Sequence, residues 1–481
     1  MSTPPLASGP EATDALRPLL ATVLDALDAG RTARGGPLPA GGPDAVAARL
    51  SAAVGDVLPE HGDPEALPTL VRALAEGSAD PAHPRCAAHL HCPPLAVATA
   101  ADLAVSALNP SLDSWDQAPA ASELEALVTR ALAKEVYGET PGDAGPRRDA
   151  APPRAVASQA PAVDAPQPPH PDALVTTGGT EANQLALLLA RETLGPGLRL
   201  LCGANAHHSL ARAAWLLGLP RPVVVPAPAG TLDPAALDAA LTAVPGPHLV
   251  AATAGTTDAG LIDPLPDLAA VCAAHGARLH IDAAYGGGLL FSDRHRPRLA
   301  GLDAAHTVTL DLHKLGWQPV AAGLLAVRDP ADLTALHQHA DYLNADDDTE
   351  AGLPDLLGRS LRTTRRPDVL KIAVTLKTLG RHGLGALVDQ VCDHAHAFAA
   401  LVRDHPGLEL HAPPTISTVL FRPTGATDTA VAEIRRRLLT DGHAVLGRAR
   451  LDGRLWLKAT LLNPHTRPHD LAALLEGSTP A

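Results

Sequence analysis

The sequence is poor in the large, flat side chains that fill many protein cores. Aromatic residues make up 2% of the chain and methionine occurs once, so a core has to be built mainly from Leu, Val and Ala. The five cysteines are scattered, their number is odd and no CxxC pair occurs. This distribution argues against a disulfide framework and favours reduced, buried thiols in a cytoplasmic protein.

The chain also lacks long apolar runs and an excess of positive charge. No run approaches the length of a membrane span, and the N-terminal residues have neither the basic start nor the apolar core of a signal peptide. Lys and Arg number 38 against 52 Asp and Glu, which gives a net charge of −14. We therefore expect a cytoplasmic protein that binds neither membranes nor nucleic acids.

The sequence does contain several segments with clear helical patterns. Apolar residues recur with the helical period between Leu16 and Leu27, and similar patterns follow at about 43–58 and 64–77. Three short helices do not make a self-sufficient core, so we expect residues 1–80 to pack on a partner subunit. Residues 138–171 are dominated by Pro, Ala, Gly and Asp, which predicts a disordered insertion.

Short apolar strands alternate with helices from residue 172 to about residue 329. This alternation predicts an α/β fold with a mostly parallel sheet and helices on both faces, in a large domain that spans 81–370. Mixed strands and helices after it predict a smaller α+β domain at 371–481. Ser122 with Glu125 three residues later is typical of a capping box, and Ser209 is a candidate cap for the helix that follows it.

Polar motifs stand at several strand ends, which is where open α/β sheets bind their ligands. The glycine-rich turn TTGGTEAN (176–183) precedes a helix and can offer backbone N–H groups to a phosphate, although it is neither a GxGxxG fingerprint nor a Walker loop. Asp282 at a strand end, followed later by His313 and Lys314, is typical of a pyridoxal-phosphate site. His207 and His208 lack a third ligand at a recognisable spacing, so no metal site is predicted.

The strings TTGGTEAN, AHHS, AGTTDAG, HIDAAYGG and DLHKLGWQP resemble the motifs of the group II pyridoxal-phosphate-dependent amino-acid decarboxylases. The likeness extends from about residue 83 to about residue 464. It implies fold type I (aspartate-aminotransferase-like), pyridoxal 5′-phosphate as cofactor and an amino acid as the small-molecule substrate. It also implies a homodimer with the active site at the subunit interface.

The same resemblance implies roles for single residues. Lys314 matches the lysine that forms a Schiff base with the cofactor, and Asp282 matches the partner of the pyridine nitrogen. Tyr342 matches a tyrosine on a mobile loop that protonates the carbanion after CO₂ leaves. The other positions match residues that hold the cofactor: His207 stacked on the ring, Ala284 on its opposite face, Gly179, Thr180 and His313 at the phosphate, and Thr257 near the ring substituents and the substrate carboxylate.

The segments HKLGWQP and EAGLPDLLGRSLRTTRRPDVLK resemble the branch that acts on L-2,4-diaminobutyrate or lysine. The expected product is then a diamine, 1,3-diaminopropane or cadaverine, for polyamine or siderophore synthesis. The acidic residues at 346–350 either attract a cationic side chain or form a solvated loop. The alternatives are a decarboxylase of an aromatic amino acid, glutamate or aspartate, a fold type I aminotransferase or C–S lyase, and a non-catalytic cofactor-binding subunit.

Overall fold

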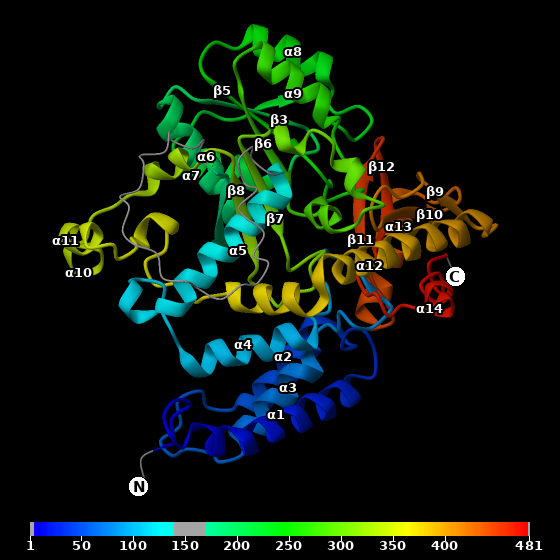
Figure 1. Cartoon of the computed structure of the whole chain (residues 1–481). Coiled ribbons are helices and arrows are strands. Elements are labelled where there is room, and N and C mark those ends of the chain that lie inside the picture. The colour runs from blue at the N-terminus through cyan, green and yellow to red at the C-terminus, as the bar shows by residue number, and fades with distance from the viewer. Residues whose placement is uncertain (1–3, 139–169, 480–481) are drawn as a thin grey trace, which may run out of the picture.

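The structure is a computed structural model that describes residues 4–138 and 170–479, so most of the predicted insertion at 138–171 lies outside the described residues. Three groups of elements are visible in Figure 1: a helical layer at the N-terminus, a large sheet covered by helices, and a small sheet at the C-terminus. Within the described ranges, no helix is long and apolar enough to cross a membrane.

The N-terminal layer consists of α1 (Ala12–Arg34), α2 (Gly42–Val54) and α3 (Ala66–Gly77). Helices α1 and α3 pack closely at Gly30, where an added Cβ atom would lie 2.5 Å from the carbonyl oxygen of Arg72. The helices bury little: Ala26 and Gly30 are the buried residues of α1, and among the described residues of α2 and α3 none is buried. Figure 1 shows this layer beside α4 (Ala96–Leu108), away from the large sheet.

Seven strands of the described chain form the large sheet, in the order β2-β8-β7-β6-β5-β3-β4. Strand β8 is antiparallel to both of its neighbours, and the other pairs are parallel. The strands are β2 (Asp172–Thr176), β3 (Arg199–Gly203), β4 (Val223–Val225), β5 (His248–Thr253), β6 (Arg278–Ala283), β7 (Thr307–Asp311) and β8 (Gly323–Val327).

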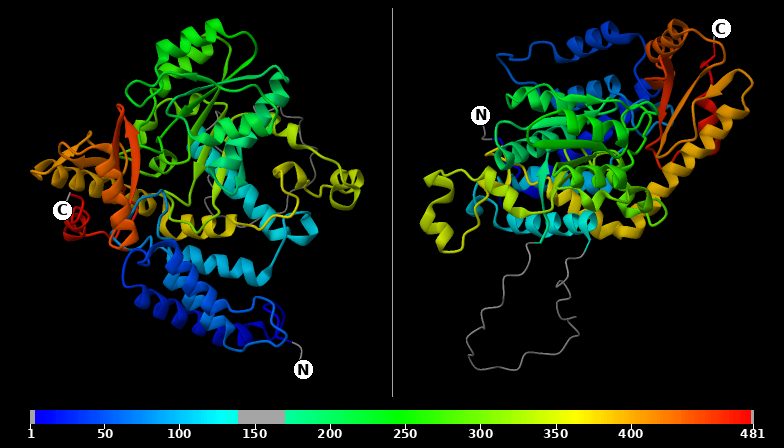
Figure 2. Two further views of the ribbon diagram at one scale, coloured as in Figure 1. Left: turned by 180° about the vertical axis from the view of Figure 1, so that it is seen from behind. Right: turned by 90° about the horizontal axis from the view of Figure 1, so that it is seen from above.

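Helices cover both faces of this sheet, as Figures 1 and 2 show. Alternate residues of one strand face opposite ways, so Leu200 packs with α6 and α7 whereas Leu201 packs with the helices of the other face. The mostly parallel α/β arrangement is as predicted. The helices are α5 (Pro119–Tyr137), α6 (Gly179–Leu194), α7 (His208–Leu216), α8 (Pro234–Ala243) and α9 (Leu265–Ala274), with short 3₁₀ turns η1 (Trp115–Gln117), η2 (Gly286–Phe291), η3 (Arg296–Leu299) and η4 (Leu302–Ala304).

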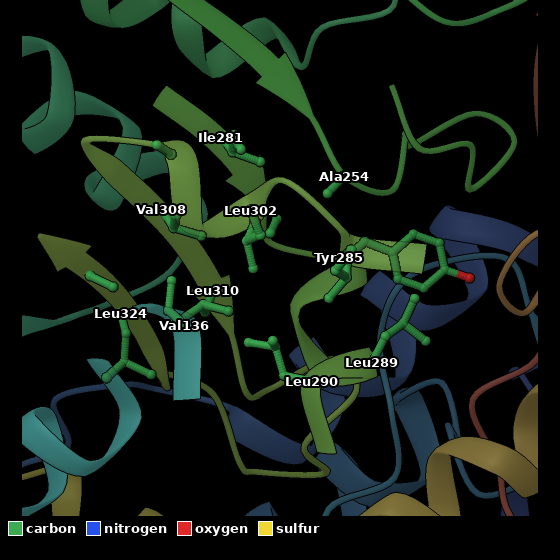
Figure 3. Close-up of a cluster of buried hydrophobic side chains, with 14 of the residues drawn as sticks. Val136, Ala254, Ile281, Tyr285, Leu289, Leu290, Leu302, Val308, Leu310 and Leu324 are labelled. Carbon is green, nitrogen blue, oxygen red and sulfur yellow. The ribbon is translucent and has the colours of Figure 1, made fainter. Parts of the chain in front are cut away.

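The core beside β6, β7 and β8 is built almost entirely from aliphatic side chains. Figure 3 shows Val308 and Leu310 from β7 in one cluster with Leu289 and Leu290 from η2. Tyr285 joins this cluster with its ring fully buried, so its hydroxyl needs polar partners. It finds them 2.9 and 3.0 Å away in two hydroxyls of the C-terminal segment, Ser417 Oγ and Thr418 Oγ1.

The small sheet has the order β1-β11-β12-β10-β9. Its first strand, Cys86–Ala87, comes from the N-terminal side of the chain and lies within the range expected for the large domain. The long helix α12 (Val369–Asp404), kinked at Gly380, runs from the large sheet to the small one (Figure 1). The other elements are β9 (Leu408–Leu410), β10 (Thr418–Pro423), β11 (Val445–Leu451), β12 (Arg454–Thr460), α13 (Asp428–Thr440) and α14 (Pro468–Ala473).

The predicted capping box at Ser122 is wrong. Helix α5 begins one turn earlier, with Pro119 at its first position, where the missing N–H of proline costs no helical hydrogen bond. Ser122 therefore lies inside the helix, and its hydroxyl donates back to the carbonyl oxygen of Pro119 at 2.8 Å. The carboxylate of Glu125 instead accepts from both terminal nitrogens of Arg365, at 2.9 and 3.0 Å.

Candidate active site

A cavity of about 330 Å³ lies at the carboxyl ends of the central strands of the large sheet. Segments that are far apart in the sequence meet there, because neighbouring parallel strands end at the same edge. Its walls contain all the predicted site residues except Tyr342: Gly179, Thr180, His207, Thr257, Asp282, Ala284, His313 and Lys314. Leu90, Tyr285 and Asp311 also line the cavity and were not singled out from the sequence.

One end of the cavity is formed by the start of α6. Gly178 has φ 155°, and a Cβ atom on it would lie 3.0 Å from the ring of His313. A Cβ atom on Gly179 would lie 3.0 Å from the Cβ of Ala284. No described side chain caps this helix, so its first N–H groups and the positive end of its dipole face an anion-binding position.

Asp282 ends β6 and is 5% exposed. One carboxylate oxygen accepts from the backbone N–H of Ala284 at 3.0 Å, and the other accepts from the side-chain amide of Asn183 at 2.7 Å. Among the described side chains, no Lys, Arg or His makes an ion pair with this carboxylate. Neutral donors therefore fix the orientation of the carboxylate, and no described cationic side chain neutralises its negative charge.

Lys314 lies one turn after β7, and its Nζ is 2.9 Å from Oδ2 of Asp311. The Asp311 carboxylate is 2% exposed, and its other oxygen, Oδ1, has no hydrogen-bond partner among the described residues. The neighbouring His313 lies 3.5 Å from the same Oδ2, and burial lowers the pKa of its ring. Asp311 could have been found from the sequence, because it directly follows the apolar strand-like segment 306–310 and lies two residues before His313.

His207 precedes α7 and caps it, because its Nδ1 accepts from the backbone N–H of Ser209 at 3.3 Å. The expectation that Ser209 itself caps this helix is therefore wrong, since the helix begins one residue earlier, at His208. Burial lowers the pKa of His207, and the nearby Asp282 opposes that shift. The side chain is thus held at the cavity as a largely neutral imidazole.

Thr257 belongs to the turn after β5. Its carbonyl oxygen accepts from Nζ of Lys458 at 3.0 Å, and Lys458 lies on β12 of the small sheet. This contact connects the two sheets at the cavity wall. The side chain of Lys458 is 7% exposed, and burial lowers its pKa.

Tyr342 does not line the cavity. It lies on the short helix α10 (Asp341–Asn344) and is 82% exposed. The acidic residues that follow form α11 (Asp346–Glu350), and none of them contacts the cavity either. Figure 1 shows both helices projecting from the body of the molecule. Along the chain they lie between η5 (Pro330–Leu336) and η6 (Leu357–Arg359).

The residues after Lys314 do not line the cavity. Trp317 is fully buried, and its indole N–H donates to the carbonyl oxygen of Leu462 at 2.8 Å. Gln318 donates to Thr375 Oγ1 at 2.9 Å. The segment that suggested the substrate branch is therefore part of the packing between the large sheet, α12 and the C-terminal segment.

The cavity suits a flat cofactor that carries a phosphate. The uncapped α6 end offers N–H donors to the phosphate, and the two glycines let that backbone come close. Asp282 has an un-neutralised carboxylate for a protonated ring nitrogen, and Lys314 supplies an amine. Within the described ranges no three His, Cys, Asp or Glu side chains are grouped as a metal site.

Comparison with known proteins gives a consistent result. Residues 159–424 match the pyridoxal-dependent decarboxylase conserved domain. The chain is 41% identical over 439 residues to L-2,4-diaminobutyrate decarboxylase of Rhizobium meliloti, covering 88% of this chain and 83% of that protein. The enzyme of the same name from Acinetobacter baumannii is 30% identical over 441 residues, which is 84% of this chain and 81% of that one.

A solved structure from Vibrio parahaemolyticus has the same architecture. It is the glutamate decarboxylase domain of diaminobutyrate-pyruvate transaminase and L-2,4-diaminobutyrate decarboxylase. The two structures superimpose with a TM-score of 0.81 at 29% sequence identity, over 98% of this chain and 96% of the other.

Proposed function

The chain belongs to the pyridoxal-dependent decarboxylase family, and on that premise we propose that it converts L-2,4-diaminobutyrate to 1,3-diaminopropane and CO₂. Membership makes it a carboxy-lyase with pyridoxal 5′-phosphate as cofactor, and the expected fold type I is confirmed with it. The substrate rests on the 41% identity to L-2,4-diaminobutyrate decarboxylase of Rhizobium meliloti over most of both chains.

The proposed roles of the cavity residues follow from their surroundings. Gly179, Thr180 and His313 hold the phosphate, because they surround the free N–H groups at the start of α6. Asp282 holds a proton on the ring nitrogen, since no cationic side chain in the described ranges pairs with its carboxylate. His207 and Ala284 pack against the two faces of the ring, and Thr257 binds the ring substituents or the substrate carboxylate.

When bound, pyridoxal phosphate accepts the electron pair that is released as the bond between Cα and the carboxylate breaks. Lys314 would give up its contact with Asp311 in order to hold the cofactor, and Asp311 would hold the amine whenever Lys314 is not joined to the cofactor. The carboxylate of Asp282 favours the cationic ring throughout. Tyr342 then delivers a proton to Cα, which requires an acid placed in a site closed to water.

Tyr342 is too exposed to act where it stands, so we propose that α10 moves or that the tyrosine reaches the cavity of a second copy. A homodimer is supported by the N-terminal layer, which leaves large apolar side chains on its surface: Leu19, Leu24, Leu27, Leu67, Leu70 and Leu74. A second copy of the chain can cover them. All five cysteines are free, which fits the cytoplasmic location that we propose.

A CO₂-release assay tests the substrate assignment. The purified enzyme with pyridoxal phosphate is offered L-2,4-diaminobutyrate, ornithine, lysine, glutamate, aspartate and the aromatic amino acids in parallel. We expect the highest kcat/KM for L-2,4-diaminobutyrate, with 1,3-diaminopropane as product. A preference for any other amino acid, or a keto acid as the main product, would contradict the proposal. Lys314→Ala is the control, and it should release no CO₂ and lose the visible absorbance of the bound cofactor.

A further inference from the structure

Asn183 lies on α6, is fully buried and does not line the cavity. Its amide nitrogen donates to Asp282 Oδ2 at 2.7 Å and to Ser209 Oγ at 2.9 Å. Its amide oxygen accepts from Thr309 Oγ1 at 2.8 Å and lies 3.0 Å from His280 Nε2. An amide has two donors and two acceptor positions, so these four contacts use its whole bonding capacity.

The carboxylate of Asp282 determines which way this amide points. An ionised carboxylate only accepts hydrogen bonds, so the amide nitrogen has to face Asp282 and the oxygen has to face His280. His280 Nε2 must then carry a hydrogen. Burial lowers the pKa of His280 to about 4, so the ring is neutral and its Nδ1 accepts from the hydroxyl of Thr307 at 2.9 Å.

The hydrogen bond from Asn183 to Ser209 also determines which nitrogen of His207 carries a hydrogen. Because Ser209 Oγ accepts from Asn183, its own hydrogen is available for Nδ1 of His207, which is 2.8 Å away. The backbone N–H of Ser209 also donates to this Nδ1, at 3.3 Å. Nδ1 therefore accepts two hydrogen bonds, and the hydrogen of the neutral ring belongs on Nε2.

Nε2 of His207 is available to a ligand, because no described residue makes a hydrogen bond to it. The charged and titratable groups that surround the ring are Asp282, Asp311, Lys314 and His208. Burial affects the pKa of His207 more than the nearby carboxylates do, so the pKa is lowered and the ring is neutral. The two forms of a neutral ring differ only in which nitrogen carries the hydrogen.

We propose that Asn183 is a positioning residue that acts through Ser209 to hold His207 as a neutral imidazole with its hydrogen on Nε2. A series of hydrogen bonds runs from Asp282 through Asn183 and Ser209 to His207. The carboxylate that is proposed to bind the ring nitrogen of the cofactor therefore also determines that His207 presents an N–H donor to the cavity. That donor suits an anion, and the carboxylate of a bound amino acid is one. The inference rests on the roles proposed for Asp282 and His207, but it does not depend on which amino acid is the substrate.

The hydrogen position can be read directly from the ring nitrogens. The full-length enzyme loaded with pyridoxal phosphate is labelled with ¹⁵N-histidine, and the signals of His207 are identified by their loss in His207→Gln. We expect a protonated Nε2 and a bare Nδ1. Ser209→Ala leaves only the 3.3 Å backbone contact and should add a second pair of signals from the other tautomer. Asn183→Leu should do the same, because it removes the amide donor to Ser209 Oγ, and the hydroxyl can then either donate to or accept from His207.

Asn205→Leu is the matched control. Asn205 also donates its side-chain amide to a carboxylate, Asp263 Oδ1 at 2.8 Å, but it lies outside the series from Asp282 to His207. Its substitution should leave the His207 signals as in the wild type, even where it lowers stability. The proposal is overturned if Ser209→Ala and Asn183→Leu keep the wild-type signals, or if Asn205→Leu changes them equally.

A kinetic comparison separates positioning from simple structural damage. Losing one oriented hydrogen bond in Ser209→Ala should lower kcat/KM about tenfold while the visible absorbance of the cofactor is retained. Ser209→Thr keeps a hydroxyl and should restore both the activity and the ring signals. A loss of activity in Ser209→Ala without any change in the His207 signals would overturn the proposal. The ring signals are recorded without substrate, so they test this inference separately from the decarboxylase assay.

Discussion

Two buried carboxylates at the cavity differ in how their charge is balanced. Asp311 faces the ammonium of Lys314 at 2.9 Å, whereas among the described residues Asp282 accepts hydrogen bonds from the amide of Asn183 and the backbone N–H of Ala284 alone. A hydrogen bond from a neutral donor orients a carboxylate but leaves its charge free to act on a third group. This difference is the physical reason to assign the ring nitrogen to Asp282 and a holding role for the lysine to Asp311.

Tyr342 is the proposed acid, and it is the one proposed site residue that does not line the cavity. Tyr342→Phe removes the phenolic proton but keeps the ring, and we expect amine formation to fall about 100-fold, the usual contribution of a positioned acid. The visible absorbance of the cofactor should not change, because the residue does not line the cavity. Amine and CO₂ are measured together, with Leu353→Ala in the same exposed region as the control. Unchanged amine formation would remove Tyr342 from the mechanism.

At the scale of elements, three arginines form ion pairs that hold the segment between α11 and α12 against the large domain. Arg359 pairs with Asp172 on β2, Arg362 pairs with Glu181 on α6, and Arg365 pairs with Glu125 on α5. Arg362 and Arg359 are partly exposed, so solvent weakens their pairs. The pair of Arg365 with Glu125 is the buried one, at 1% and 5% exposure.

Breaking this buried pair should destabilise the chain strongly. Arg365→Met leaves the Glu125 carboxylate buried without a cation, which costs about 3–5 kcal/mol in comparable cases. We expect the midpoint of urea unfolding, followed by circular dichroism, to move to a clearly lower concentration. The double variant with Glu125→Leu removes both charges and should recover most of the loss. An Arg365→Met protein as stable as the wild type would contradict this reading of the pair.

At the scale of the whole molecule, the N-terminal layer is the part that the chain itself leaves least covered. Helices α1 and α2 both pack on α3, yet Leu24, in the apolar stripe predicted for α1, is 66% exposed. Figure 2 shows the layer at the edge of the molecule, away from the helices that cover the large sheet. An apolar layer of this kind is expected to be buried against another subunit.

Removal of residues 1–80 should therefore abolish dimerisation. The truncated chain and the full chain are compared by sedimentation velocity, where we expect a monomer or an aggregate for the former and a dimer for the latter. Leu24→Asp with Leu74→Asp in the full chain is the milder variant, because it places charge on the exposed apolar surface without removing any helix. A stable dimer of the truncated chain would show that the contact between subunits lies elsewhere.

The sequence by itself determined the parts of this protein that are local. Hydrophobic periodicity located the helices and strands, because period 3.6 and period 2 follow from backbone geometry alone. The motif strings then indicated the family and placed Gly179, His207, Asp282 and Lys314 at strand ends. Helix starts were less accurate, since Pro119 and His208 begin helices that the serines Ser122 and Ser209 suggested would start later.

Tertiary structure decided everything that depends on contacts between distant segments. Asn183 and Asp311 stand inside the strings TTGGTEAN and DLHKLGWQP, but their partners appear only when α6, β6 and β7 bring them to Asp282 and Lys314. The same holds for β1, which joins the small sheet from the other end of the chain, and for Trp317, which packs at a junction and not at the cavity. Strand order and burial set these contacts, and neither is a property of a short stretch of sequence.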